Sequence, residues 1–391
     1  MTADRVSPPG NARDWDAASK MSLEELDDAV TKNPRDAGAH FFRGDHLRIA
    51  GHMRDALEAF KLAAELAPRQ IAAHVAVGRM RLALNENAEA LDAFESALDL
   101  DPKNVDTLCA KGQALAALQR MAECLEPLDL AASLDPYSAT AQEGRGFAQY
   151  SLGWDDDGLA AFRRAVALNP KNPSLHWMIG MVLMRHGNDM EAMAECDHAL
   201  ELDSSSAHPR ILRCAILSSH RRHKEALDEI ELALSHEPDN LACKVIRSLV
   251  LSNLGRGDEA LGEIRGVVYE CPGLEHAQWA LGRILATLGR PEEALEPLER
   301  AIESDPNNVR AHTYMINALF ELGRIREGVE AIKAASEQNP NEGIFYAYMG
   351  RIYQGSDDKT AQKYFAKAHS LDPTLNLPNP GAGNGESHGG Q

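Results

Sequence analysis

The closest approach to a metal-binding motif in this 391-residue sequence is a pair of histidines, His220 and His223, three positions apart. On a helix, two imidazoles at that spacing share one face and could bind a divalent ion such as zinc. Arg221 and Arg222 lie between them, and their positive charges disfavour a cation at the same place. The segment also falls where a turn between two helices is predicted below. We interpret it as a basic turn in contact with solvent and predict no metal site.

Other residue patterns that would indicate an enzyme are missing from the sequence. It contains no phosphate-binding loop of the form G-x-x-x-x-G-K-[ST], no G-x-S-x-G around a serine nucleophile and no H-E-x-x-H zinc motif. Without these, no group of residues forms a recognisable catalytic pattern. We therefore predict that the protein is not an enzyme, has no catalytic residues and needs no cofactor.

The cysteines suggest neither a zinc site nor a disulfide framework, because no two of them form a C-x-x-C pair. Several fall where helices are predicted to pack, so we interpret them as small apolar side chains. Unpaired thiols suit a reducing compartment, and the first residues contain no apolar leader. We therefore expect a cytoplasmic protein. The six residues are Cys109, Cys124, Cys196, Cys214, Cys243 and Cys271.

The net charge argues against one class of partner. The chain has 40 Lys and Arg against 59 Asp and Glu, which gives −19 at pH 7. Binding to nucleic acid relies on clustered cations that displace counterions from phosphates, so we expect no nucleic-acid partner. No apolar run approaches the length of about 18 residues that a membrane span needs. Aromatic residues make up only 5% of the chain and alanine is abundant, which is typical of closely packed helices.

The elements that must position any site follow a repeat of 34 residues. Ser204 occupies the one grid position that lacks proline, and Pro373 closes the series one residue early, which predicts a single deletion between Gly350 and Ala361. The prolines on the grid are Pro34, Pro68, Pro102, Pro136, Pro170, Pro238, Pro272, Pro306 and Pro340.

Other positions keep the same register and predict two helices in each unit. One column is mostly glycine, as at Gly44 and Gly78, and another is mostly bulky and apolar, as at Phe60 and Phe94. Small residues are needed where two helices cross closely, and bulky ones fill the space between them. A further glycine, such as Gly289, marks the break between the two helices of a unit. The closing proline ends the second helix.

Two helix starts carry the signature of a capping box. Ser22 is followed by Glu25, and Asn188 is followed by Glu191. In such a box the short side chain and the glutamate satisfy backbone N–H groups at the start of the helix. We predict a capping box at both places.

This pattern resembles the tetratricopeptide repeat family, whose helix–turn–helix unit has the same length and a closing proline. The resemblance covers ten units at 37–373, preceded by an incomplete repeat or cap at 20–36. It implies an all-α fold, a right-handed α-solenoid whose first helices line a concave groove that binds another protein. Some unit tops depart from the usual aromatic residue, and we interpret their histidines as structural substitutes: His40, His74, His176 and His312.

If the family geometry holds, aromatic and arginine side chains of the first helices face this groove. Aromatics interleaved with Arg and Asn suit a bound peptide, because Arg binds carboxylates and Asn amides bind backbone groups. The alternative interpretation of each residue is packing between repeats, since core and groove share the same helices. The candidate groove residues are Phe147, Tyr150, Trp177, Met181, Met184, Trp279, Arg283, Arg310, Tyr314, Asn317, Tyr348 and Arg351.

The two ends of the chain differ from the repeats in composition. We expect residues 1–19 to be mobile, with Trp15 packing on the incomplete repeat. The Gly/Pro-rich segment 374–391 is expected to be disordered. Because a solenoid needs a cover for its last helix, either Leu375 and Leu377 fold back on it or another subunit covers it.

The leading functional hypothesis is a non-catalytic scaffold or adaptor for protein–protein interaction, which holds a peptide or helix of a partner protein in its groove. A second hypothesis is a self-assembling structural scaffold that associates through the uncovered terminal repeats. The sequence itself does not identify the partner.

Overall fold

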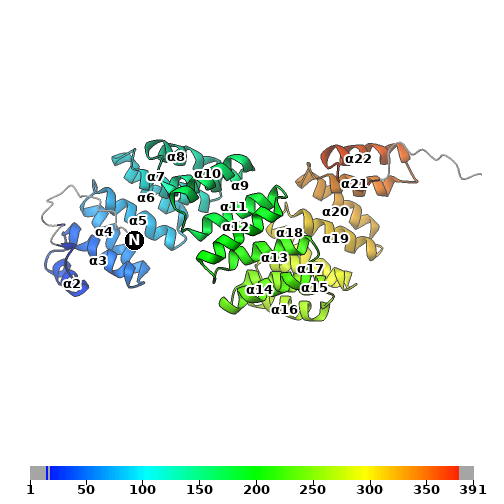
Figure 1. Cartoon of the computed structure of the whole chain (residues 1–391), viewed down its shortest axis with the longest axis horizontal. Helices are drawn as coiled ribbons and strands as arrows, with labels where there is room; N and C mark the ends of the chain where they lie inside the picture. Colours follow the sequence, from blue (N-terminus) through cyan, green and yellow to red (C-terminus); the bar gives the residue numbers. More distant parts are fainter. Residues whose placement is uncertain (1–14, 16–17, 378–391) are drawn as a thin grey trace, which may run out of the picture. The chain divides into compact units, whose positions relative to one another are not determined.

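The computed structural model describes Trp15 and residues 18–377, and in this part of the chain every regular element is an α-helix (Figure 1). Helix α2 (Leu23–Lys32) is followed by ten helix pairs. The first helices are α3 (Ala37–Ile49), α5 (Ile71–Ala83), α7 (Val105–Ala117), α9 (Ala139–Ser151), α11 (Pro173–Arg185), α13 (Ala207–Ser219), α15 (Leu241–Asn253), α17 (Glu275–Thr287), α19 (Val309–Glu321) and α21 (Gly343–Tyr353). The second helices are α4 (Met53–Leu66), α6 (Asn87–Leu100), α8 (Met121–Leu134), α10 (Asp155–Leu168), α12 (Asp189–Leu202), α14 (His223–His236), α16 (Gly257–Glu270), α18 (Pro291–Ser304), α20 (Ile325–Gln338) and α22 (Asp358–Leu371).

The prediction of an all-α repeat fold is confirmed, and each first helix begins 34 residues after the previous one. The predicted deletion appears in the last repeat, where α21 has 11 residues and the other first helices have 13. None of the described helices has the length and apolar character needed to cross a bilayer.

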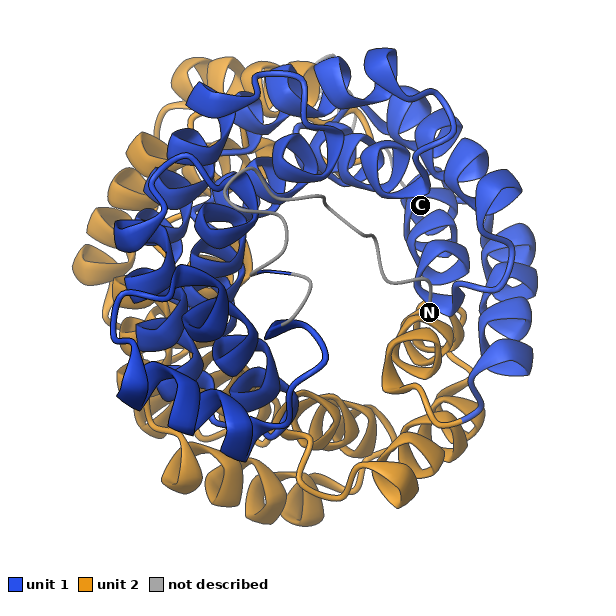
Figure 2. Ribbon diagram, turned by 90° about the vertical axis from the view of Figure 1, so that its left-hand side faces the viewer, with its two compact units in different colours: residues 1–204 blue, residues 205–391 orange. Residues whose placement is uncertain are grey.

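The chain divides into two compact units, residues 1–204 and 205–391 (Figure 2). Unit 1 contains α2 to α12, and unit 2 contains α13 to α22. The boundary follows Ser204, which is the one grid position without proline. The change in the repeat and the division of the chain therefore fall at the same place.

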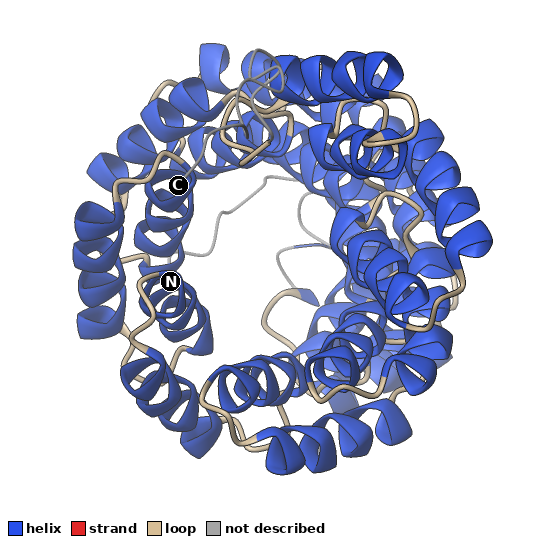
Figure 3. Ribbon diagram, turned by 90° about the vertical axis from the view of Figure 1, so that its right-hand side faces the viewer, coloured by secondary structure: helices blue, strands red, loops and turns tan. Residues whose placement is uncertain are grey.

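Within each unit the helices lie in two layers, one of first helices and one of second helices (Figure 3). First helices of successive repeats touch along α5, α7, α9 and α11 in unit 1, and along α13, α15, α17 and α19 in unit 2. No comparable contact joins the second helices of successive repeats in the part of the chain that the structure describes. The first helices are therefore the closer set, and each unit bends toward them.

The histidines at the tops of the units have a structural role in three of four cases, as predicted. Nε2 of His40, His74 and His312 lies 3.0, 2.9 and 2.9 Å from the carbonyl oxygen of the proline six residues earlier. Gln278 donates its side-chain N–H to the equivalent carbonyl of Pro272 at 2.8 Å. A polar side chain at this position thus satisfies a carbonyl that the closing turn leaves unpaired.

The segment around His220 forms the turn that was predicted for it. His220 ends α13, Arg221 adopts a left-handed conformation with φ 59°, and His223 begins α14. Gly289 has a similar φ of 69° at the corresponding break. The two imidazoles of the predicted basic turn therefore lie on either side of a break and do not share one helical face.

One of the two predicted capping boxes is present. The Ser22 hydroxyl accepts a bond from the Glu25 backbone N–H, and the Glu25 carboxylate accepts one from the Ser22 backbone N–H. The prediction at Asn188 is wrong, because its side chain makes no capping bond although α12 does begin after it. Asn188 has ψ 57° in the tight turn, whereas Ser22 has the extended backbone, ψ 164°, that directs a cap toward the helix.

Trp15 and the last described leucines cover the ends of the array. Trp15 is buried, and its ring packs on Phe41 and Phe42 at 5.1 and 5.8 Å, so it covers the first full repeat rather than the incomplete one. Leu375 and Leu377 pack against a cluster on α21 and α22. Of the two covers weighed for the last helix, the fold-back of these leucines is therefore observed. The rest of the segments expected to be mobile or disordered, residues 1–14, 16–17 and 378–391, lies outside the described residues.

Candidate functional site

The first-helix layer of unit 2 brings Trp279 together with two arginines. Trp279 lies on α17 and is 9% exposed. The guanidinium carbons of Arg283 and Arg310 lie 5.8 and 5.7 Å from the centre of its ring, within the range of cation–π contacts. Arg283 also donates an Nη2 hydrogen to Oδ1 of Asn253 at 2.7 Å. Three residues predicted for the groove are thus assembled around one indole.

Polar groups of this cluster lack the partners that such groups usually have. The Nε1–H of Trp279 is buried and has no hydrogen-bond acceptor among the described residues. Neither Arg283 nor Arg310 forms an ion pair with a carboxylate in the same part of the chain, although Arg310 is exposed and the protein is strongly acidic. Buried donors are normally satisfied, so this cluster has unused binding capacity.

Three further predicted residues continue the same face along α19 and α21. Arg283, Asn317 and Arg351 occupy one column of the repeat on α17, α19 and α21. Tyr348 donates its hydroxyl to Oδ1 of Asn317 at 2.9 Å, and burial raises the pKa of this phenol. Tyr314 packs on the apolar cluster that contains Trp279. The predicted unit 2 residues therefore include both surface arginines and partly packed aromatics.

Arginines in the inter-helix turns of unit 2 are engaged with carboxylates, and this pattern was missed in the sequence. Each begins a second helix and binds the glutamate three residues later; Arg290 and Glu293, for example, are 2.6 Å apart. Exposed pairs of this kind contribute little stability, about 0.2–1 kcal/mol, but they neutralise the cation. The pairs are Arg222–Glu225, Arg256–Glu259, Arg290–Glu293 and Arg324–Glu327.

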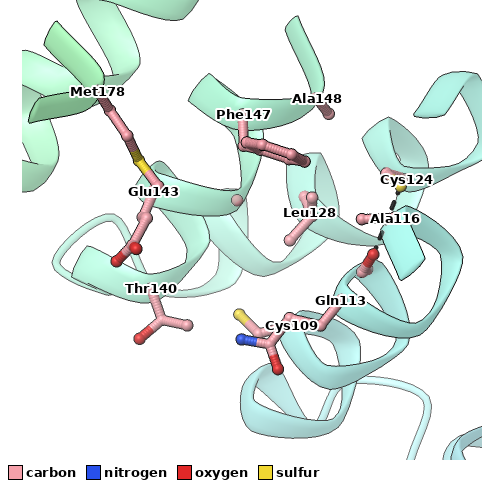
Figure 4. Close-up of a pocket in the computed structure, with 12 residues that line it drawn as sticks. Cys109, Gln113, Ala116, Cys124, Leu128, Thr140, Glu143, Phe147, Ala148 and Met178 are labelled. Atoms are coloured by element: carbon pink, nitrogen blue, oxygen red, sulfur yellow. Dashed lines mark hydrogen bonds between the residues drawn. The ribbon is translucent and has the colours of Figure 1, made fainter. Parts of the chain in front are cut away.

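In unit 1, Phe147 lines a pocket of about 260 Å³ between α7, α8, α9 and α11 (Figure 4). Met178 on α11 lies at the same pocket, whereas the predicted groove residues Met181 and Met184 do not line it. Burial raises the pKa of Glu143, whose carboxylate lies at the mouth together with Thr140. The pocket is mainly apolar and offers a place for a partner's side chain.

The remaining predicted residues of unit 1 are half-buried, and one of them is covered. The guanidinium of Arg185 lies 3.7 Å from the centre of the Tyr150 ring and donates to the Tyr150 carbonyl at 3.1 Å. Asp155 holds the same guanidinium at 2.6 Å. Trp177 lies on α11 and is half-buried. Tyr150 is therefore a packing partner of Arg185, which is the alternative that the sequence left open.

The buried cysteines are chemically quiet. Burial raises the pKa of the Cys109 thiol to about 11 and that of Cys214 to about 12. The Cys124 Sγ donates to the Gly112 carbonyl at 3.4 Å, as the dashed line in Figure 4 shows. A thiol must ionise to act as a nucleophile or metal ligand, so these positions suit packing. All six cysteines are free, and only Cys271 is not fully buried.

A second pocket, in unit 2, is lined by charged groups that already neutralise one another. It measures about 480 Å³ and lies beside α15 and α16. Arg247 binds Glu263, Arg256 binds Glu259 at 2.6 Å, and Lys244 lies 3.7 Å from Glu270. Because these charges are paired, the pocket has less capacity for an ionic ligand than the surface around Trp279.

Comparisons with known proteins identify the repeat. One family model, described as tetratricopeptide repeat, matches residues 12–71, 77–139 and 156–207, and a second, described as Psidin, N-terminal TPR repeats region, matches 217–373. No curated protein sequence matches the chain.

Solved structures show the same architecture. The APC/C hetero-tetramer Cut9–Hcn1 aligns with a TM-score of 0.56 at 15% identity over 79% of this chain and 62% of that chain, so this chain spans less than two thirds of its length. A tetratricopeptide repeat protein from Parabacteroides merdae ATCC 43184 aligns with a TM-score of 0.54 at 17% identity over 63% of this chain and 97% of that chain. Because both family models describe this repeat and fall on the helix pairs described above, the chain belongs to the tetratricopeptide repeat family.

Proposed function

We propose that the protein is a non-catalytic adaptor that binds an acidic peptide segment of another protein on the first-helix layer of unit 2. The observation that carries the proposal is the cluster around Trp279. Its buried indole N–H has no acceptor, and Arg283 and Arg310 beside it have no carboxylate partner among the described residues. A peptide carboxylate between them would accept from the arginines, and a peptide carbonyl could accept from the indole.

The column of Arg283, Asn317 and Arg351 supports an extended ligand rather than a single ion. Neighbouring helices pack about 8–10 Å apart, so two repeat steps span about 20 Å. An extended chain advances about 3.3 Å per residue and covers this distance in about six residues. Two acidic side chains at that separation would reach Arg283 and Arg351, while the Asn317 amide lies between them for backbone groups.

Charge complementarity favours an acidic ligand over a basic one. The chain as a whole carries −19, and a basic peptide would bind at many places on its surface. At the Trp279 cluster the sign is reversed, because the turn arginines are neutralised and the face arginines are not. Specific binding is therefore expected at this cluster.

Fluorescence anisotropy with two labelled twelve-residue peptides tests the proposal. One peptide carries glutamates six residues apart, and its matched partner carries glutamines at the same positions. We expect the glutamate peptide to bind at least about tenfold more tightly, since a charged hydrogen bond contributes about 1.5–3 kcal/mol. W279F keeps an aromatic ring in the cluster and removes only the N–H donor, so it should weaken binding by about fivefold.

Arginine variants separate the proposed site from general electrostatics. R283A and R351A should each weaken the glutamate peptide by about tenfold and leave the glutamine peptide unaffected. R326A removes the same charge from an exposed position on the second-helix layer and serves as the control. Equal binding of the two peptides, or an equal loss in R326A and R283A, would reject the site.

Self-assembly through the terminal repeats is the second candidate function. The packing of Leu375 and Leu377 on α21 and α22 reduces the apolar surface available for it. Light scattering of the full chain and of a chain ending at Pro340 distinguishes the two candidates, because a monomer in both cases excludes self-assembly. We also propose a reducing compartment such as the cytoplasm, which the six free cysteines support.

A further inference from the structure

We propose that His176, Glu195 and His198 in unit 1 form a binding site for a divalent transition-metal ion of the zinc class. His176 lies on α11, and the other two lie on α12 of the same repeat. Nδ1 of His176 is 2.7 Å from Oε2 of Glu195, and Nδ1 of His198 is 4.0 Å from the same oxygen. The three possible ligand atoms lie within 4.8 Å of one another. Two imidazoles and one carboxylate are ligands that zinc prefers.

His176 departs from the other histidines of its column. Those at positions 40, 74 and 312 contact the carbonyl of the preceding proline, which explains why a polar residue is present there. His176 forms no such bond, and its Nδ1 faces Glu195 on the neighbouring helix. The structural role that accounts for the other three therefore does not account for His176.

Glu195 occupies a column that is otherwise small or neutralised. Ala59, Ala93 and Ala161 are its equivalents in earlier repeats. The next two equivalents are glutamates with permanent cations: Glu229 lies 2.8 Å from Arg213, and Glu263 binds Arg247.

In the repeat of Glu195, Ile179 stands at the position that Arg213 and Arg247 occupy in the next two repeats. The ionic partners of Glu195 in the described part of the chain are imidazoles, which carry a charge only when protonated. A divalent ion would supply the positive charge that arginines supply to Glu229 and Glu263. This difference between otherwise equivalent repeats points to a ligand at this repeat.

The geometry needs only small side-chain movements. Ligand atoms at about 2.0–2.1 Å from a tetrahedral ion are about 3.3 Å apart. The Glu195–His176 pair must open by about 0.6 Å and the Glu195–His198 pair must close by about 0.7 Å, relative to 2.7 and 4.0 Å. His198 is more than half exposed on its side chain, which allows this movement. Three protein ligands leave a fourth position for water.

Isothermal titration of the full chain with Zn²⁺ tests the site, with Mg²⁺ as a metal that avoids nitrogen ligands. Each test variant takes the residue found at an equivalent position of another repeat, so that folding is preserved. H176Q follows Gln142 and Gln278, E195A follows Ala161, and H198S follows Ser96. We expect one tight Zn²⁺ per chain and at least a tenfold weaker affinity in each variant, while Mg²⁺ does not compete.

A matched control and a spectroscopic readout identify the ligands. H220A/H223A removes two other histidines and should leave the affinity for Zn²⁺ unchanged. Co²⁺ bound to the wild-type chain should give the visible absorption of a four-coordinate ion, and E195A should abolish it. The proposal is overturned if the wild type shows no saturable Zn²⁺ binding, if the three variants bind as the wild type does, or if H220A/H223A causes the loss.

Discussion

Phe94 on α6 lies so close to Gly78 on α5 that a β-carbon on this glycine would be 2.5 Å from the ring. Phe94 is fully buried and has no free space into which it could move. The same contact recurs at Gly44 with Phe60, and at Gly146 with Phe162. The glycine and bulky columns of the sequence therefore meet inside each helix pair.

G78A should destabilise the protein because the added methyl group overpacks this contact, with an expected loss of about 1–3 kcal/mol. G262A is the control, since Gly262 is also in a helix and a β-carbon there meets nothing within 4 Å. Its expected effect is a gain of up to about 1 kcal/mol from helix propensity. Urea unfolding followed by circular dichroism measures both, and a G78A midpoint at or above that of wild type would contradict the packing argument.

The buried thiols should resist alkylation in the folded protein. With pKa values raised to about 11 for Cys109 and Cys243 and about 12 for Cys214, almost no thiolate is present at pH 8. Iodoacetamide followed by mass spectrometry should label Cys271 first, and should label all six cysteines after denaturation. Reaction of Cys109 at its denatured rate would show that the helix pairs open readily.

The same thiols predict a loss of stability at alkaline pH. An unfolded cysteine ionises near pH 8.5, whereas the folded thiols keep their protons to about pH 11. The folded state therefore binds more protons than the unfolded state between these values, and the free energy of unfolding falls as pH rises through this window. The C214A variant should show a weaker pH dependence than wild type in urea unfolding at pH 8 and pH 10.

The repeat could be predicted from the sequence because its signal is local and recurs at one spacing. Pro68 and Gly78 each specify a backbone or packing requirement of one unit, and the structure meets both. Contacts between side chains on different helices were harder. The Tyr348–Asn317 bond joins two predicted residues, but residues 31 positions apart carry no pairing signal in a single sequence.

Two features that the sequence analysis missed have signals in the columns. Glu195 stands where Ala161 stands one repeat earlier, and comparison of the columns would have singled it out. The failed cap at Asn188 has no such signal, because capping depends on ψ at the turn. Arg185 covers Tyr150 through rotamers that spacing does not determine.

The contrast between Ser22 and Asn188 can be measured. S22A removes an observed capping bond and should destabilise α2 by about 1 kcal/mol, whereas N188A removes no such bond and should change α12 by only a few tenths. Hydrogen exchange of peptides that contain each helix start reports the local effect. Equal acceleration of exchange at both helices would contradict the difference in cap geometry.

Leu375 and Leu377 should keep the last repeat covered. L375S/L377S exposes the cluster of Tyr346, Ala347 and Ala368, and the exposed apolar surface should promote association. Sedimentation velocity should show a monomer for wild type and a concentration-dependent dimer for the variant. A monomeric variant with unchanged thermal stability would show that these leucines do not cover α21 and α22.

The contact of Phe94 with Gly78 has a consequence for the length of the protein. Both residues belong to one repeat, so excision of residues 71–104 removes the contact whole and joins Gln70 to Val105 in unchanged register. Duplication of the same segment would add a complete contact in the same way. Whole units can therefore be gained or lost without repacking the interior of any other unit, which makes the number of repeats an evolvable property independent of the fold.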